Sequence, residues 1–260
     1  MEFILHILAG ATVGLAVGLT GIGGGSLMTP ILLMFGYPAH IAIGTDLLYA
    51  GITKSAGVNA HRKQGTIRWR IVLAMAAGSL PAAIIAAILL GQYFDNSHDY
   101  KSLLTTSLGI MLTLTGIVIL LKNKLQAQAG KVHSKVLAAI QGHRYLWTFI
   151  MGLALGALVT LSSVGAGAIG TALLLLLYPR LPSIQVIGTD IAHAVPLTLV
   201  AGFSHLLLGN VDFSLLLALL IGSLPAIQIG TRLATRIPDG VLQPALAIIL
   251  LGIGIKYIVW

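Results

Sequence analysis

Long uncharged apolar runs alternate with short polar stretches along this chain. Residues 71–91 and 102–121 lack Asp, Glu, Lys and Arg, and about 20 such residues are enough for a helix to cross the core of a bilayer. Similar runs recur over most of the 260 residues. The pattern predicts an all-α polytopic membrane protein, because helices that are apolar on every face need lipid or a very large core around them.

The apolar runs fall into two sets of four predicted segments. In the first half they are 3–36, 41–60, 71–91 and 102–121. In the second half they are 145–178, 186–208, 213–231 and 241–260. We expect about eight transmembrane segments. They divide into an N-terminal repeat (1–121), a basic connecting loop (122–144) and a C-terminal repeat (145–260), which together form one membrane domain.

The two halves share residues at a constant spacing of 144 positions. The sequence IGTD occurs at 43–46 and 187–190, and GSLPA occurs at 78–82 and 222–226. Further matches at this spacing pair Gly21 with Gly165, Gly23 with Gly167, Pro38 with Pro182, His61 with His205 and Gly65 with Gly209. Matches among Asp, His, Pro and Gly in one register are rare by chance, so the sequence indicates a tandem duplication.

Glycines interrupt the first segment of each half. Residues 18–30 read GLTGIGGGSLMTP, and inside a helix glycine costs about 1 kcal/mol and proline about 3 kcal/mol relative to alanine. A continuous helix over 3–36 would be about 51 Å long, whereas a bilayer core is about 30 Å thick. We therefore expect two shorter helices in each first segment, forming either one broken span or a hairpin that enters the membrane and returns.

The basic residues distinguish these two topologies. The net charge of +8 comes from Lys and Arg in the short loops, which fits a positive-inside bias rather than a nucleic-acid partner. If each first segment re-enters, the halves are inverted, and only Lys101 and Lys256 lie on the outer side. This obeys the positive-inside rule better than parallel halves do. We therefore expect inverted repeats with a pseudo-two-fold axis, an arrangement that places transporter sites near the membrane midplane.

Four ionisable residues within the apolar segments are candidate functional residues. Asp46 and Asp190 occupy the same repeat position, where they are expected to cap the following helix, to bind substrate or a coupling proton, or both. His193 lies one helical turn after Asp190 and is a candidate for proton coupling, with a structural hydrogen bond to Asp190 as the alternative. Lys54 is a candidate to pair with an anion, unless its side chain extends to the membrane interface.

The glycine interruptions supply the second set of candidates. Free N–H groups at a broken helix bind anions without a cationic side chain, although small residues also serve close helix packing. Hydroxyl groups at the two breaks come from Thr20, Ser26, Thr29, Ser162, Ser163 and Thr171. The candidate substrate-binding residues are Gly23, Gly24, Gly25, Ser26, Thr45, Ser162, Ser163, Gly165, Gly167 and Thr189.

Other residues are expected at the membrane interface or argue against an enzyme. His61 and His205 lie at segment ends, and Trp69, Trp147, Tyr178 and Trp260 are typical of an aromatic belt. The chain has no cysteine, and its one glutamate is Glu2. The sequence offers neither a nucleophile with its base nor a metal-ligand spacing, so we expect no catalytic residue, metal or cofactor.

Residues 18–57 and 61–83 resemble the sulfite exporter family of the TauE/SafE type, and the likeness extends over essentially the whole chain. It is carried by the glycine-rich break, the following Gly-Thr motif and the GTIRW sequence at 65–69. The chain departs from the family pattern in carrying Asp46 and Asp190 after Gly-Thr. The resemblance implies a multi-pass permease of the plasma or inner membrane for small sulfur-containing anions such as sulfite or organosulfonates.

The combined features predict a secondary transporter that works by alternating access with a coupling proton. Its expected partners are a small anion, the lipid bilayer and the proton, without nucleic acid. A passive anion channel is one alternative and would need no titrating pair. A cation- or proton-coupled transporter, in which Asp46 and Asp190 bind the cation directly, is the other.

Overall fold

The computed structural model describes the chain apart from residues 1, 21–26, 94–97, 129–141, 234–238 and 260. The described residues form helices joined by short connections. The helices are α1 (Glu2–Thr20), α2 (Met28–Met34), α3 (Ala39–Lys63), α4 (Trp69–Tyr93), α5 (His98–Gln128), α7 (Arg144–Ser162), α8 (Ala168–Leu177), α9 (Ser183–Leu207), α10 (Phe213–Leu233) and α11 (Asp239–Val259). The predicted all-α class is confirmed, and each first segment holds two helices, as its glycines predict.

Five of the described helices are long and apolar enough to cross a membrane. The five spans are Trp69–Gln92, Ser102–Leu121, Arg144–Ser162, Ser183–Leu207 and Phe213–Gly230. The helix α3 is as long as α9 but is not among them, because Asp46, Lys54 and the basic residues at its end lower its hydropathy. The chain is a multi-pass membrane protein. That it crosses the membrane about eight times stays a prediction.

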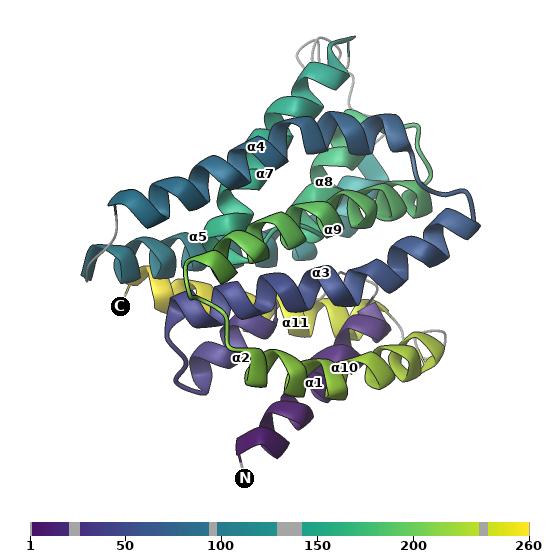
Figure 1. Ribbon diagram of the computed structural model, residues 1–260. Helices are drawn as coiled ribbons and strands as arrows, with labels where there is room; N and C mark the ends of the chain where they lie inside the picture. Colours follow the sequence, from purple (N-terminus) through teal and green to yellow (C-terminus); the bar gives the residue numbers. More distant parts are fainter. Residues whose placement is uncertain (1, 21–26, 94–97, 129–141, 234–238, 260) are drawn as a thin grey trace.

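The helices form pairs around a central pair (Figure 1). Helices α3 and α9 lie side by side through the middle, with α4 and α7 on one side and α1 and α10 on the other. Helices α5 and α11 pack together behind them. A buried apolar cluster that includes Ile43, Leu104, Val159 and Leu197 joins α3, α5, α7 and α9.

The central helices α3 and α9 run antiparallel. Close contacts at glycine positions pair Gly44 with His205, Leu48 with Gly202, Gly51 with Leu199, Gly57 with Ile191 and His61 with Gly188. As the residue number rises along α3, the number of its partner in α9 falls. The glycines allow this close approach, because a Cβ at Gly51 or Gly202 would overlap the facing leucine.

The first segment of the first half enters and leaves at the same end of the molecule. Helix α1 runs parallel to α10, with Gly10 packed on Leu219 and Gly14 on Ser223. The start of α3 lies at the start of α10, because the Asp212 N–H donates a hydrogen bond to Thr45 Oγ1 over 3.1 Å. Both ends of the segment therefore lie beside the start of α10, as in a hairpin.

The first segment of the second half makes similar contacts with α4. Gly152 and Gly156 of α7 pack on Met75 and Ser79 of α4. The Arg68 N–H, just before α4, donates to Thr189 Oγ1 near the start of α9 over 3.0 Å. The segment α7–α8 therefore also begins and ends beside the same end of its partner helix.

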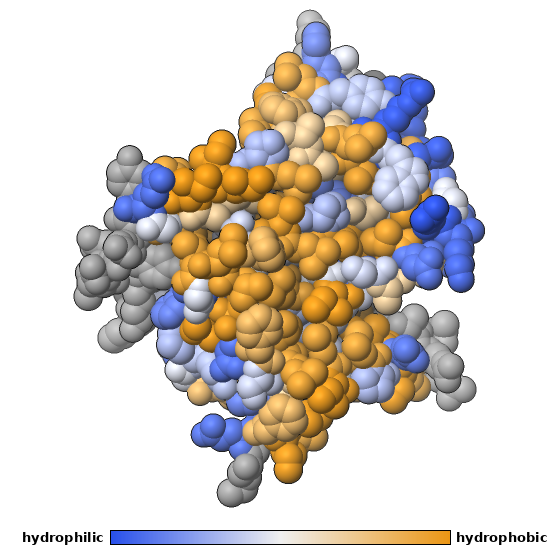
Figure 2. Space-filling view, viewed as in Figure 1, coloured by the Kyte–Doolittle hydropathy of each residue, from blue (hydrophilic) through white to orange (hydrophobic). Residues whose placement is uncertain are grey.

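Apolar side chains dominate the surface of the helices. Figure 2 shows them across the middle of one face, with hydrophilic side chains at the edge where α3 ends and α4 begins. The exposed side chains include Leu73, Leu207 and Ile248, with exposed fractions of 66%, 74% and 65%. In water such a surface would be unstable, and in a bilayer it faces the acyl chains.

Some positions differ from the sequence predictions. His205 was expected at the interface but is fully buried, and its Nε2 bonds the Thr160 carbonyl over 2.9 Å. Tyr178 is also buried and bonds the Thr148 hydroxyl. Trp69 and Trp147 are exposed, as an aromatic belt requires. The burial of His205 and Tyr178 follows from contacts between distant helices, which a segment's own pattern does not contain.

Candidate functional site

Two buried aspartates lie at equivalent positions in the central pair. Asp46 of α3 is fully buried, and Asp190 of α9 is 1% exposed. Each lies seven residues after the start of its helix, and the residues that cap these helices are Pro38 and Pro182. The expectation that the aspartates cap the helices is therefore wrong. Their carboxylates are available for another role.

Each aspartate is held by a threonine from the short helix of its own half. Asp46 Oδ2 accepts hydrogen bonds from Thr29 Oγ1 at 2.5 Å and from the Thr29 N–H at 3.2 Å. Asp190 Oδ2 accepts one from Thr171 Oγ1 at 3.0 Å. These bonds hold the carboxylates against the broken segments α1–α2 and α7–α8, as the hydroxyls in those segments suggested.

The break of the second half also reaches the aspartate of the first. Ser163 Oγ donates to Asp46 Oδ2 over 3.0 Å. Ser163 can do so because it ends α7 in a left-handed conformation, with φ of 58°. Its neighbour Ser162 instead bonds locally, to the Leu158 carbonyl. Of the two predicted serines, the structure brings only Ser163 to an aspartate.

Each carboxylate keeps one buried oxygen without a hydrogen bond to any described residue. These atoms are Asp46 Oδ1 and Asp190 Oδ1. Gly170 of α8 lies directly against Asp190 Oδ1, where a Cβ would overlap that oxygen. A buried acceptor without a partner costs about 1–3 kcal/mol. Buried oxygens without a partner are often found at sites where a ligand, an ion or a proton supplies the missing bond.

Lys54 is buried inside the protein, next to the break of the second half. It is 7% exposed, and its Nζ donates to the Ala166 carbonyl, between α7 and α8, over 3.0 Å. Its charge interacts with Asp190 and, less strongly, with Asp46. The alternative that Lys54 extends to the membrane interface is therefore wrong, and its ammonium group lies inside the protein.

His193 faces the GSLPA sequence of the other half. It is fully buried, and its Nε2 lies 2.8 Å from Ser79 Oγ. Within the described part of the chain its Nδ1 has no hydrogen-bond partner, so the structural bond to Asp190 is not formed. The equivalent tyrosine, Tyr49, lies beside Ser223 of the second GSLPA sequence. Ser79 was missed at the sequence level, although its repeated motif was visible.

The remaining predicted residues divide into three groups. Gly165 and Gly167 have positive φ values of 111° and 137° and form the break around Ala166. The hydroxyls of Thr45 and Thr189 accept backbone bonds from the opposite half. Gly23, Gly24, Gly25 and Ser26 lie outside the described residues. The described site therefore consists of two aspartates, a lysine and hydroxyl groups around the break that ends α7.

Several known membrane proteins are similar to this chain. Residues 6–257 match the family model described as sulfite exporter TauE/SafE. The chain is 37% identical over 252 residues to the "Probable membrane transporter protein YjnA" of Bacillus subtilis (strain 168), covering 97% of this chain and 98% of that protein. It is 27% identical over 251 residues to the "Probable membrane transporter protein YdhB" of the same organism, covering 94% and 95%.

A third relative comes from a different bacterium. The chain is 26% identical over 264 residues to a "Probable membrane transporter protein" of Xylella fastidiosa (strain Temecula1 / ATCC 700964), covering 100% of this chain and 95% of that protein. No solved structure matches. The family model covers nearly the whole chain. The three relatives match this chain over nearly their full length, and each is named a probable membrane transporter protein. The chain therefore belongs to the sulfite exporter TauE/SafE family of membrane transporters.

Proposed function

We propose that this protein is a secondary transporter of small sulfur-containing anions, such as sulfite or an organosulfonate, that works by alternating access. The observation that carries the proposal is the pair of buried aspartates, Asp46 and Asp190, at equivalent positions of two antiparallel helices, together with the buried Lys54, whose charge interacts with both. Ionisable residues at membrane depth are costly and mark ion or substrate paths. The family description supports the class of anion.

An inverted repeat accounts for the exchange of contacts between the halves. The Asp212 N–H bonds Thr45, and the Arg68 N–H bonds Thr189. Both donors and both acceptors are 144 positions apart, so each half makes the same contact with the other, as two-fold symmetry requires. Because α3 and α9 run antiparallel, the axis crosses the helices and lies in the membrane plane.

Equivalent residues of the two halves are 142 positions apart in the broken segments and 144 positions apart after them. Thr29 and Thr171 make the same bond to their aspartates but are 142 positions apart. Gly10 and Gly152 pack on equivalent residues and are also 142 positions apart. Two residues are therefore inserted in the second half before Pro182. In this register Ser163, and not Gly165 as the sequence matches suggested, corresponds to Gly21, so the two breaks differ at the position that reaches Asp46.

The charges of the site explain why transport would be coupled. Two carboxylates and one ammonium leave one negative charge in excess when all are ionised. An anion that bound Lys54 in place of the Ala166 carbonyl would add to this excess, which is unfavourable in a buried site. A proton on Asp46 Oδ1 or Asp190 Oδ1 offsets the charge of a monovalent anion, so the net charge of the site stays the same. The anion and the proton would then move together.

In an alternating-access cycle, the Thr45 and Thr189 contacts would close the site at opposite ends. They lie near the starts of α3 and α9, hence at opposite ends of an antiparallel pair. Breaking one contact while keeping the other would open the site to one side only. The halves would rock about the α3–α9 pair, as inverted repeats do in other transporter folds.

Coupling to a metal cation is a second candidate. Two carboxylate oxygens that no described residue bonds also suit a hard monovalent or divalent cation. Replacing a sodium gradient by a proton gradient distinguishes the two ions. A passive channel differs from both, because it cannot concentrate its substrate.

Accumulation in proteoliposomes tests the function. The purified protein is reconstituted, and uptake of labelled sulfite and of a short alkyl sulfonate is measured with and without an imposed pH gradient. The proposal expects accumulation above the external concentration that needs the gradient and is blocked by excess unlabelled anion. Uptake that only equilibrates would contradict a secondary transporter and support a channel.

A further inference from the structure

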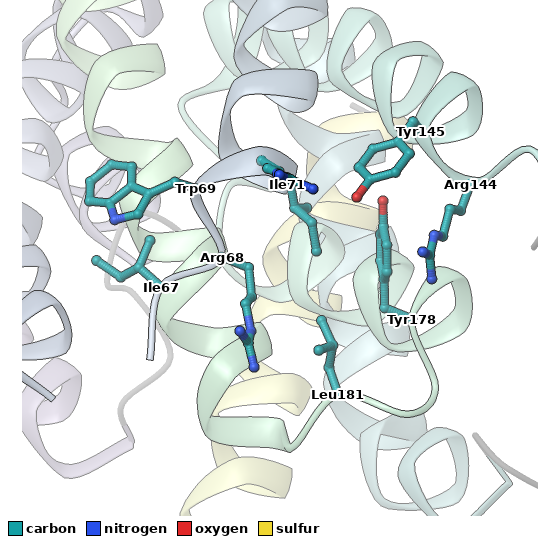
Figure 3. A pocket seen from close by; sticks show the side chains of 9 residues that line it. Ile67, Arg68, Trp69, Ile71, Arg144, Tyr145, Tyr178 and Leu181 are labelled. Carbon is teal, nitrogen blue, oxygen red and sulfur yellow. The ribbon is translucent and has the colours of Figure 1, made fainter. Parts of the chain in front are cut away.

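A hollow of about 460 Å³ opens at the basic end of the molecule, apart from the aspartates. It lies between the start of α4, the start of α7 and the turn from α8 to α9 (Figure 3). Its polar lining comes from Arg68, Trp69, Arg70, Arg144, Tyr145 and Tyr178. None of the described residues that line it is acidic. The hollow therefore favours an anionic ligand.

Two of the arginines are held in place by neighbours. The Arg144 guanidinium lies 5.5 Å from the centre of the Tyr145 ring and 5.7 Å from that of Tyr178. Arg68 Nε donates to Gln185 Oε1 over 2.9 Å, and its other N–H groups, which bond no side chain in the described part of the protein, can bind a ligand. Figure 3 shows the two tyrosine rings on one side of the hollow and Arg68 with Leu181 on the other.

An apolar floor separates the hollow from the aspartate site. Ile71 and Tyr178 line the hollow and pack in one buried cluster with Met75, Leu174 and Val186. A small anion on its way to Asp190 would have to pass through this cluster without a polar partner. The hollow is therefore poorly placed as an entrance for the transported anion.

The walls beside the hollow face lipid. Leu73 of α4 and Leu146 and Ile150 of α7 have exposed fractions of 66%, 56% and 41%. Trp69 is also 50% exposed, and tryptophan prefers the level of the lipid headgroups. A ligand that fits both surroundings has an anionic head and apolar chains.

We propose that this hollow binds the headgroup of an anionic phospholipid. Arg70, Arg144 and the free N–H groups of Arg68 bind its phosphodiester oxygens, while Tyr145 and Tyr178 orient Arg144. The acyl chains lie along the exposed apolar faces of α4 and α7. Basic pockets between membrane helices on the cytoplasmic side recognise anionic headgroups in this way. The site ties the α4–α7 pair to the inner leaflet.

Lipid titration of the purified protein tests this site without a transport assay. Mixed micelles of dioleoyl phosphatidylglycerol or dioleoyl phosphatidylcholine are added in detergent, and the shift in melting temperature gives an apparent Kd. Phosphatidylglycerol is expected to stabilise the protein and phosphatidylcholine is not. Arg70→Gln and Arg144→Gln should each weaken phosphatidylglycerol binding about fivefold.

Matched variants and a soluble anion complete the design. Arg62→Gln is the control, because Arg62 is exposed at the same end but does not line the hollow. Arg144→Lys keeps the charge and should bind more tightly than Arg144→Gln, which separates lost charge from misfolding. Equal stabilisation by both lipids, or equal weakening by Arg62→Gln, would overturn the proposal. Inorganic phosphate that binds as tightly as phosphatidylglycerol would also overturn it, because the site would then serve a free anion.

Discussion

Ser163 donates a hydrogen bond to Asp46 over 3.0 Å, although 117 residues separate them in the chain. The bond joins the break of the second half to the buried carboxylate of the first half. Asp46 thereby receives donors from both halves, Thr29 from one and Ser163 from the other. A movement of one half against the other changes the bonding of this carboxylate directly.

Removing the Ser163 hydroxyl should impair transport strongly. Hydrogen bonds to charged groups contribute about 1.5–3 kcal/mol, so Ser163→Ala is expected to lower kcat/KM for anion uptake at least about tenfold. Ser55→Ala is the matched control, because Ser55 is exposed and bonds the Gly51 carbonyl within its own helix, and it should change uptake less than about twofold. Equal losses in initial uptake rate for the two variants would contradict a specific role of the Ser163 hydroxyl in transport.

Adding one methyl group beside Asp190 should block the site. A Cβ at Gly170 would overlap Asp190 Oδ1, so Gly170→Ala must displace the carboxylate, at a cost that reduces uptake about tenfold or more. Alanine favours the helix, so the protein should still fold. The control is Gly252→Ala, since no described atom lies within 4 Å of a Cβ there. Normal uptake by Gly170→Ala, measured at equal protein density in liposomes, would argue against a role for that oxygen.

Lys54 should determine affinity for the anion. Lys54→Gln removes the cation that interacts with both aspartates, and the KM for anion uptake is expected to rise at least about tenfold. Lys54→Arg retains the charge and should keep part of the affinity, which separates charge from folding. Lys63→Gln is the control at the exposed end of the same helix. An unchanged KM in Lys54→Gln would place the anion elsewhere.

The Thr45 and Thr189 contacts should bias the transporter toward opposite states. Valine keeps the shape of threonine but cannot accept the bond from the opposite half. Because one hydrogen bond contributes about 1 kcal/mol, each substitution should shift the equilibrium between the two states about fivefold. Thr45→Val should open the end near Asp212, and Thr189→Val should open the end near Arg68.

Labelling of single cysteines measures this bias, because the chain has no cysteine of its own. Val211→Cys and Ile67→Cys lie beside the two contacts at equivalent repeat positions. Thr45→Val should speed the reaction of Val211→Cys with a membrane-impermeant maleimide and slow that of Ile67→Cys. Thr189→Val should do the reverse. Both rates rising together would indicate local loosening and contradict alternating access.

The sequence predicts the parts of the site that depend on local pattern. Glycines mark the break between Ser162 and Ala168 because they disfavour a continuous helix, and the matched IGTD sequences locate Asp46 and Asp190. The expected capping role fails because Pro38 and Pro182 start these helices earlier than the aspartates.

Contacts between the halves are not contained in either half's own pattern. The bond from Ser163 to Asp46 and the pairing of His193 with Ser79 depend on how α7, α3, α9 and α4 pack. Lys54 illustrates the same limit. A lone lysine near the end of an apolar segment can reach lipid headgroups, whereas in the structure Lys54 bonds the Ala166 carbonyl of the second half and stays inside.

Proton movement during anion uptake tests the central claim most directly. A short alkyl sulfonate stays ionised near neutral pH, so a trapped pH dye in proteoliposomes reports only protons that the protein carries with it. The account predicts internal acidification during uptake by the wild type and by Asp212→Asn, whose carboxylate caps α10 through the Leu215 N–H. Asp190→Asn should bind the sulfonate but lose both acidification and pH-driven accumulation. Acidification by Asp190→Asn equal to the wild type would contradict the claim.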